Sequence, residues 1–141
     1  MPSLFEISTS ALTAQRIRMQ AIANNIANVE TSNAGLDKQG NVMPYRRRRV
    51  HFQVGLDAKN PSDGVSVAKV DEDPTPFRLV YDPSHPYAIQ SGPEAGYVRM
   101  PNVNPTLEMV DLMSASRSYE ANITALETTR NMMQSAIRIL A

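Results

Sequence analysis

Long helical patterns occupy the two ends of the chain, and the residues that interrupt helices lie between them. All six glycines fall between Gly35 and Gly96, and nine of the ten prolines fall between Pro44 and Pro105. In each terminal segment apolar residues recur in heptads, the spacing of a coiled-coil seam. We therefore predict an α+β fold: long N- and C-terminal helices pair as an antiparallel coiled coil, and a small, irregular, β-rich module lies between them.

The N-terminal pattern has one heptad row at Phe5, Leu12, Met19 and Ile26 and a second at Ser8, Gln15, Ile22 and Val29. Ser3 and Glu6 have the spacing of a capping box, which favours a helix start there. Small residues flank the seam and allow a close approach between helices: Ala11, Ala14, Ala21, Ala23 and Ala27. One amphipathic helix packing on its own domain and a helix buried among several neighbours explain the pattern equally well.

Three asparagines, Asn24, Asn25 and Asn28, lie near the end of this segment. Asparagine is a poor residue for a helix interior because its side chain competes for backbone groups. We interpret these amides as hydrogen-bonding partners for another chain or as caps of the helix end.

The C-terminal pattern begins at Asn104-Pro105, where Asn favours the N-cap and Pro the first helical position. From Leu107 to Ala141 there is no glycine or proline. A helix of this length extends about 50 Å, more than a domain of this size needs. Its two heptad rows are Met109, Ser116, Ile123, Arg130 and Ile137, and Leu112, Tyr119, Leu126, Met133 and Leu140. Arg130 within the seam indicates a polar partner nearby.

Alternating apolar residues in the middle predict short strands over 50–54, 65–67 and 77–81. The basic run Arg46–Arg49 enters the first of these, so we favour a solvated strand face or a subunit contact over a nucleic-acid site. Our hypothesis is that acidic groups of a neighbouring subunit face this run. The acidic residues 71–73 precede Pro74 and predict a solvated turn, while His51 and His85 are isolated and lack metal-ligand spacing.

Composition excludes several classes of function. The chain has 14 basic and 14 acidic residues, which argues against a general binder of nucleic acid or anionic membranes, and it has no cysteine for disulfides or thiolate chemistry. Apolar runs are too short to span a membrane, and no cleavable signal peptide is visible. No catalytic, cofactor or metal cluster is recognisable, so we expect a structural subunit rather than an enzyme. The alternative is a coiled-coil regulatory or adaptor protein that binds acidic partners through Arg46–Arg49.

Particular stretches resemble a known family. Residues 23–31, reading ANNIANVET, resemble the N-terminal signature of bacterial flagellar rod and hook proteins. Residues 97–104 (YVRMPNVN) and 108–122 (EMVDLMSASRSYEAN) are similar to the proximal rod group within that family. Where distal rod and hook members often have Pro-Gly-Phe, this chain has Ser32-Asn33-Ala34, a departure that fits the proximal rod better.

The resemblance implies a subunit of the flagellar basal body that is exported through the flagellar type III apparatus without signal cleavage. It implies a helical, hollow, periplasm-spanning rod shared with other copies, with proteins such as FlgB, FlgF and FlgG, and with the rod-base adaptor FliE. Residues 1–32 and 105–141 would form the inner coiled-coil domain, and 33–104 the outer module. The subunit interface is expected at Leu12, Met19, Ile22, Asn24, Asn25, Ile26, Asn28 and Val29, and at Met109, Leu112, Tyr119, Asn122, Ile123, Leu126, Met133, Ile137 and Leu140.

Overall fold

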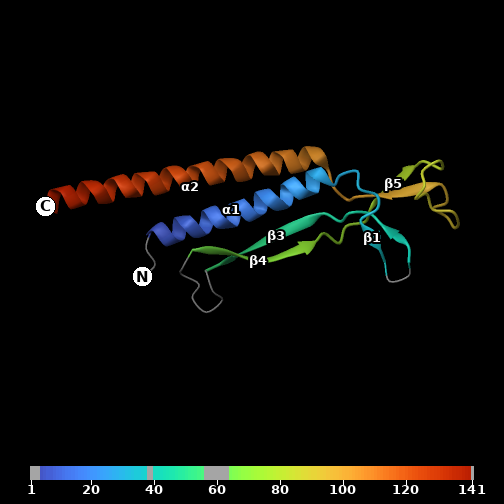
Figure 1. Ribbon diagram of the computed structural model, residues 1–141, viewed down its shortest axis with the longest axis horizontal. Coiled ribbons are helices and arrows are strands. Elements are labelled where there is room, and N and C mark those ends of the chain that lie inside the picture. The colour runs from blue at the N-terminus through green and yellow to red at the C-terminus, as the bar shows by residue number, and fades with distance from the viewer. Residues whose placement is uncertain (1–3, 38–39, 56–63, 141) are drawn as a thin grey trace.

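Two antiparallel helices form the long axis of the molecule, and β-hairpins accompany and extend them (Figure 1). The computed structural model describes residues 4–37, 40–55 and 64–140. Its elements follow in the order α1 (Leu4–Ala27), β1 (Gly35–Leu36), β2 (Val42–Met43), β3 (Arg48–Val54), β4 (Val65–Glu72), β5 (Arg78–Tyr81), β6 (Tyr97–Met100) and α2 (Pro105–Leu140). The predicted α+β class and the antiparallel helix pairing are confirmed.

Contacts along the helix pair fix its direction. The Asn25 side chain near the end of α1 donates to Glu108 in the first turn of α2 over 3.0 Å. Met19, earlier in α1, lies against Ser116, with 3.9 Å between the two side-chain heteroatoms. Because α2 has 36 residues and α1 has 24, α2 continues past the start of α1 at the end marked C in Figure 1.

The ends of the helices follow their local chemistry. Asn104 caps α2, because its Oδ1 accepts from the amides of Thr106 and Leu107 at 3.0 and 3.4 Å. Pro105 is the first residue of α2, as predicted. The predicted cap at Ser3 lies outside the described residues.

Each of the three predicted strands is present, and three further strands were missed. Strand β3 pairs with β4, and β5 pairs with β6, both antiparallel. β1, β2 and β6 were not predicted, because two are only two residues long and the third was considered only as part of a family motif. The prediction of a turn over 71–73 was wrong: Asp71 and Glu72 are the last residues of β4, opposite Arg49 and Arg48.

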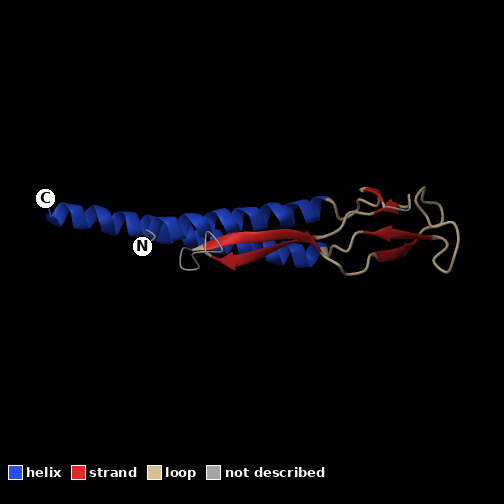
Figure 2. Ribbon diagram, turned by 90° about the horizontal axis from the view of Figure 1, so that it is seen from below, coloured by secondary structure: helices blue, strands red, loops and turns tan. Residues whose placement is uncertain are grey.

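The β3–β4 hairpin lies along α1, while β1–β2 and β5–β6 lie beyond the helices at the opposite extremity from the C-terminal end of α2 (Figures 1 and 2). Small side chains of α1 permit the close approach of the hairpin. Ser10 is buried and accepts a hydrogen bond from the amide of Val65 at 3.1 Å. Ala14, which we expected to flank the helix–helix seam, instead lines a groove with Val65 and Val67.

Gly64 stands where the hairpin meets α1. Its φ of +94° is unfavourable for any residue with a side chain, and an added Cβ would collide with the Ser10 hydroxyl. A glycine is therefore needed on both grounds at this junction.

The first predicted heptad row of α2 is retained only at Ser116 and Ile123, which are half-buried. The buried positions are Glu108 and Ala115, whereas Met109 is 53% exposed. Sequence periodicity favoured large apolar residues, but the closely packed seam contains a small residue and a carboxylate there. The second row is retained in part, since Leu112, Tyr119 and Leu126 are half-buried.

Candidate assembly surfaces and polar junction

A buried cluster of polar side chains, here called the polar junction, joins the end of α1, the start of β3, the end of β4 and the start of α2. Its members are Asn25, Arg47, Asp73, Asn102 and Glu108. Asn25 and Glu108 are each only 1% exposed. Buried polar groups are costly unless their hydrogen bonds are satisfied, so the geometry of this cluster determines whether it stabilises the fold.

The Asn25 side chain forms hydrogen bonds through both its amide nitrogen and its amide oxygen. The Nδ2 atom donates to the Arg48 carbonyl at 2.9 Å and to Glu108 Oε2 at 3.0 Å. The Oδ1 atom accepts from the Arg48 amide at 2.9 Å and from the Tyr45 hydroxyl at 3.0 Å. This one side chain therefore holds the first residue of β3 against both helices.

Arg47 connects three acidic groups of its own chain. Its Nε donates to Glu108 Oε1 at 2.6 Å, and its Nη1 lies 3.2 Å from Asp73 Oδ2. Its Nη2 lies 3.7 Å from Asp111 Oδ2. A guanidinium satisfies several acceptors in one plane, which suits this arrangement better than a lysine would.

Asn102, just before α2, completes the junction through the backbone. Its Oδ1 accepts from the Arg47 amide at 2.8 Å, and its Nδ2 donates to the Thr75 hydroxyl at 2.8 Å. The Asp73 amide in turn donates to the Arg47 carbonyl at 2.8 Å. Four chain segments are thus held together by side chains that are up to 83 residues apart in sequence.

The protonation behaviour of the junction follows from these contacts. The Thr75 amide, which donates to the Asp73 carboxylate, lowers the pKa of Asp73 below its usual value; burial opposes this effect and Arg47 adds to it. Burial disfavours the charge of Arg47, but the hydrogen bond and charge of Glu108 outweigh that effect and raise the pKa of Arg47. Burial also raises the pKa of Tyr45. The ionised forms of Asp73 and Arg47 are the native ones.

The structure corrects the interpretation of the basic run. We expected its acidic partners on a neighbouring subunit, but Arg46, Arg47 and Arg49 have acidic partners within the same chain, at Glu72, Asp73, Glu108, Asp111 and Asp71. Arg46 also lies 4.2 Å above the Phe77 ring. Antiparallel pairing of β3 with β4 places the basic and acidic runs side by side. This pairing could not be recognised in the sequence, because the two runs lie far apart along the chain.

Two of the three asparagines near the end of α1 have partners within the chain. Asn25 belongs to the polar junction, and Asn28 donates to the Asn24 carbonyl of its own helix at 2.9 Å. The Asn28 bond supports the alternative that these amides stabilise the helix end. Asn24 is exposed.

The other predicted interface residues occupy three kinds of position, and their role in subunit contacts stays a prediction. Ile22 is buried; Leu12, Met19, Ile26, Val29, Leu112, Tyr119, Asn122, Ile123 and Leu126 are half-buried; and Met109, Met133 and Ile137 are exposed. The side chain of Leu140 lies outside the described residues. All of the half-buried group except Val29, which follows α1, lies on the two long helices. Contacts with neighbouring subunits would cover the parts of these side chains that the chain itself leaves exposed.

The last part of α2, residues 128–139 (here called the distal end of α2), differs from the rest of the helix. Residues 130–139 are all exposed, including Met132 at 68%, Ile137 at 66% and Ile139 at 84%. Met132 and Ile139, seven residues apart, lie on one face, and Ile137 lies on the other. A helix that is apolar on opposite faces requires neighbours on both.

The part of the chain that the structure describes holds no group of three or more His, Cys, Asp or Glu side chains arranged to bind a metal ion. Neither described helix combines the length and apolar character needed to cross a bilayer. The polar junction joins the two terminal helices, and both helices leave apolar side chains exposed that neighbouring chains could contact.

Comparisons with known proteins identify the assembly. The model for "Flagella basal body rod protein" matches residues 5–34, and the model for "Flagellar basal body rod FlgEFG protein C-terminal" matches residues 94–139. The flagellar basal-body rod protein FlgC of Borreliella burgdorferi is 43% identical over 98% of this chain and 96% of that protein. The FlgC proteins of Bacillus subtilis (43%; 94% and 93%) and Yersinia enterocolitica (44%; 97% and 96%) are similar. The chain belongs to the FlgC family and is a structural subunit of the flagellar basal-body rod.

Proposed function

We propose that the chain assembles through its terminal helices into the wall of a hollow, periplasm-spanning rod that transmits torque. The observation that supports this proposal most directly is the exposed distal end of α2. There, apolar side chains on opposite faces of the helix are not buried by any described part of the chain. Burial of a large apolar side chain contributes about 1.5–3 kcal/mol, so covering several of them favours assembly strongly.

The partners that fit this role are further copies of the chain, other rod proteins such as FlgB, FlgF and FlgG, the rod-base adaptor FliE, and the flagellar type III export apparatus. The chain acts in this scheme as a structural element rather than as an enzyme. It reaches the rod without cleavage of a signal peptide, so the protein recovered from basal bodies is expected to retain its N-terminal residues.

Amide exchange tests the assembly role. In the isolated chain, residues 128–139 are expected to exchange rapidly, because residues 130–139 are all exposed, while residues 108–116, which begin at the polar junction, exchange more slowly. In purified basal bodies both regions are expected to be protected. If residues 128–139 exchanged rapidly in basal bodies while residues 108–116 were protected, the end of α2 would not be part of the rod wall.

A further inference from the structure

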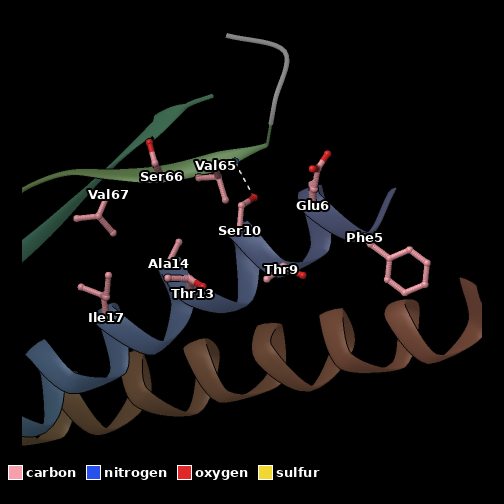
Figure 3. Close-up of a pocket in the computed structure, with 10 residues that line it drawn as sticks. All are labelled: Phe5, Glu6, Thr9, Ser10, Thr13, Ala14, Ile17, Val65, Ser66 and Val67. Carbon is pink, nitrogen blue, oxygen red and sulfur yellow. Dashed lines mark hydrogen bonds between the residues drawn. The ribbon is translucent and has the colours of Figure 1, made fainter. Parts of the chain in front are cut away.

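A groove between α1 and β4 stands out as unfilled space beside the helix pair. Its volume is about 410 Å³, and it is lined by Phe5, Glu6, Thr9, Ser10, Thr13, Ala14, Ile17, Val65, Ser66 and Val67. In Figure 3 the α1 helix with Ser10 and Ala14 faces the β4 strand with Val65 and Val67. Ala14 is 3% exposed and is too small to fill the space next to it.

The groove persists because the hairpin is held at one end. The hydrogen bond from the Val65 amide to Ser10, together with Gly64, brings β4 close to the helix there. Further along, Val65 lies above Ala14 and Val67 lies above Ile17, and space remains between the strand and the helix (Figure 3). The groove therefore offers an apolar surface that a side chain from elsewhere can enter.

The distal end of α2 has complementary properties. Met132 and Ile139 project from one face, with the small residues Ser135 and Ala136 between them. Both arginines of residues 128–139, Arg130 and Arg138, point away from this face, so the face itself carries no charge. Within one chain the distal end of α2 continues past α1 and away from the groove (Figure 1).

We propose that the distal end of α2 from a second copy of this chain occupies the groove between α1 and β4. The proposal rests on the assembly role proposed above and names one of its contacts. Because groove and helix end are different parts of one chain, the contact is heterologous, and every copy presents one of each. A heterologous contact forms a ring if its rotation closes and an open helical array if it does not, and a displacement along the helix axis keeps the array open.

The proposed contact also implies a displacement between the two copies along the helix axis. Within one chain Met19 lies against Ser116, so Ala14 lies near residue 121 of its own α2. Two copies that point the same way, with Ala136 of one beside Ala14 of the other, are displaced along the helix axis by about 22 Å, taking about 1.5 Å per residue.

Cysteine pairs test this contact cleanly, because the chain has no cysteine of its own. Cells lacking the native protein would express two single variants together, Thr13→Cys and Ala136→Cys, and basal bodies would be oxidised and analysed on non-reducing gels. The matched control replaces Ala136→Cys by Gln134→Cys, an exposed position two residues away on the opposite face of the same helix. Since a disulfide requires Cα atoms within about 7 Å, we expect at least about tenfold more dimer from the proposed pair than from the control pair.

A second pair in the same register, Ile17→Cys with Met132→Cys, tests the same contact at another point. It remains informative if one of the first two substitutions disturbs the local structure. Motile cells in which neither pair exceeds the control would overturn the groove contact while leaving the rod role intact. The same conclusion follows if Thr13→Cys bonds equally well to a cysteine at Gln134. If the native chain itself is absent from basal bodies, the proposed assembly role fails together with the groove contact.

Discussion

The two halves of α2 belong to one helix, yet they are stabilised in opposite ways. Its first turns belong to the polar junction, where Glu108 is 1% exposed and paired with Asn25 and Arg47. Its last turns expose Met132 and Ile139. The first turns of α2 are thus tied to the chain's own polar junction, although Leu107, Met109, Val110 and Met113 remain exposed there. In contrast, residues 130–139 contain no buried side chain among the residues that the structure describes.

The largest expected loss of stability comes from breaking the junction. Arg47→Met leaves the Glu108 carboxylate buried without its cation, which is expected to cost about 3–5 kcal/mol. The free energy of unfolding of the isolated chain in urea, followed by circular dichroism, measures this cost. Arg48→Met, at an exposed neighbour, is the control and is expected to change little.

The double variant Arg47→Met with Glu108→Met separates charge from packing. It is expected to be more stable than Arg47→Met alone, because no charge is then left buried and unpaired. Equal destabilisation of the single and double variants would argue against an electrostatic role for the junction.

A smaller loss is expected where the hairpin meets α1. Gly64→Ala places a Cβ at a φ of +94° and against the Ser10 hydroxyl. The backbone alone costs roughly 1–2 kcal/mol. Gly92→Ala, at a φ of +97° with nothing within 4 Å of the added Cβ, carries only the backbone cost and is the matched control. If the two variants unfold at the same urea concentration, the contact of Gly64 with Ser10 contributes nothing.

Acid is expected to weaken the junction through Asp73. Its pKa is lower in the folded chain than in the unfolded chain, so its ionised form contributes stability above the unfolded value of about 3.9. That stability is lost as the pH falls through the lower folded value. Asp73→Asn is therefore expected to be less stable near neutral pH but to lose less stability on acidification, as measured by urea midpoints across this range.

The smallest effect on the isolated chain is expected at the distal end of α2. Ile139→Lys changes a side chain that is 84% exposed, so the free energy of unfolding should shift by no more than about 0.5 kcal/mol. Assembly should nevertheless suffer, because a lysine replaces an apolar side chain that the rod would bury. Soft-agar motility and the amount of variant in basal bodies report this loss. Full motility with native incorporation would mean that Ile139 stays in solvent within the rod.

The same contrast explains which features could be predicted from the sequence. Asn104 and Pro105 identify the start of α2 because capping is a local effect, and alternation of apolar residues identifies β3, β4 and β5. The junction could not be predicted, since Arg47 and Glu108 lie 61 residues apart and nothing in either segment selects that pairing. The heptad pattern missed the fully buried position Ala115, because so small a side chain carries too little apolar signal to mark the seam.

The antiparallel course of the helices has a practical consequence for labelling the protein. The start of α1 and the end of α2 lie toward one extremity of the molecule, and the loop between β5 and β6 lies at the other (Figure 1). A peptide tag fused to either terminus would enter the region proposed to be covered by neighbours. An epitope inserted between Ser91 and Gly92, which are both exposed, would project away from that region. The β5–β6 loop is therefore the position of choice for an antibody or fluorophore that must leave the rod intact.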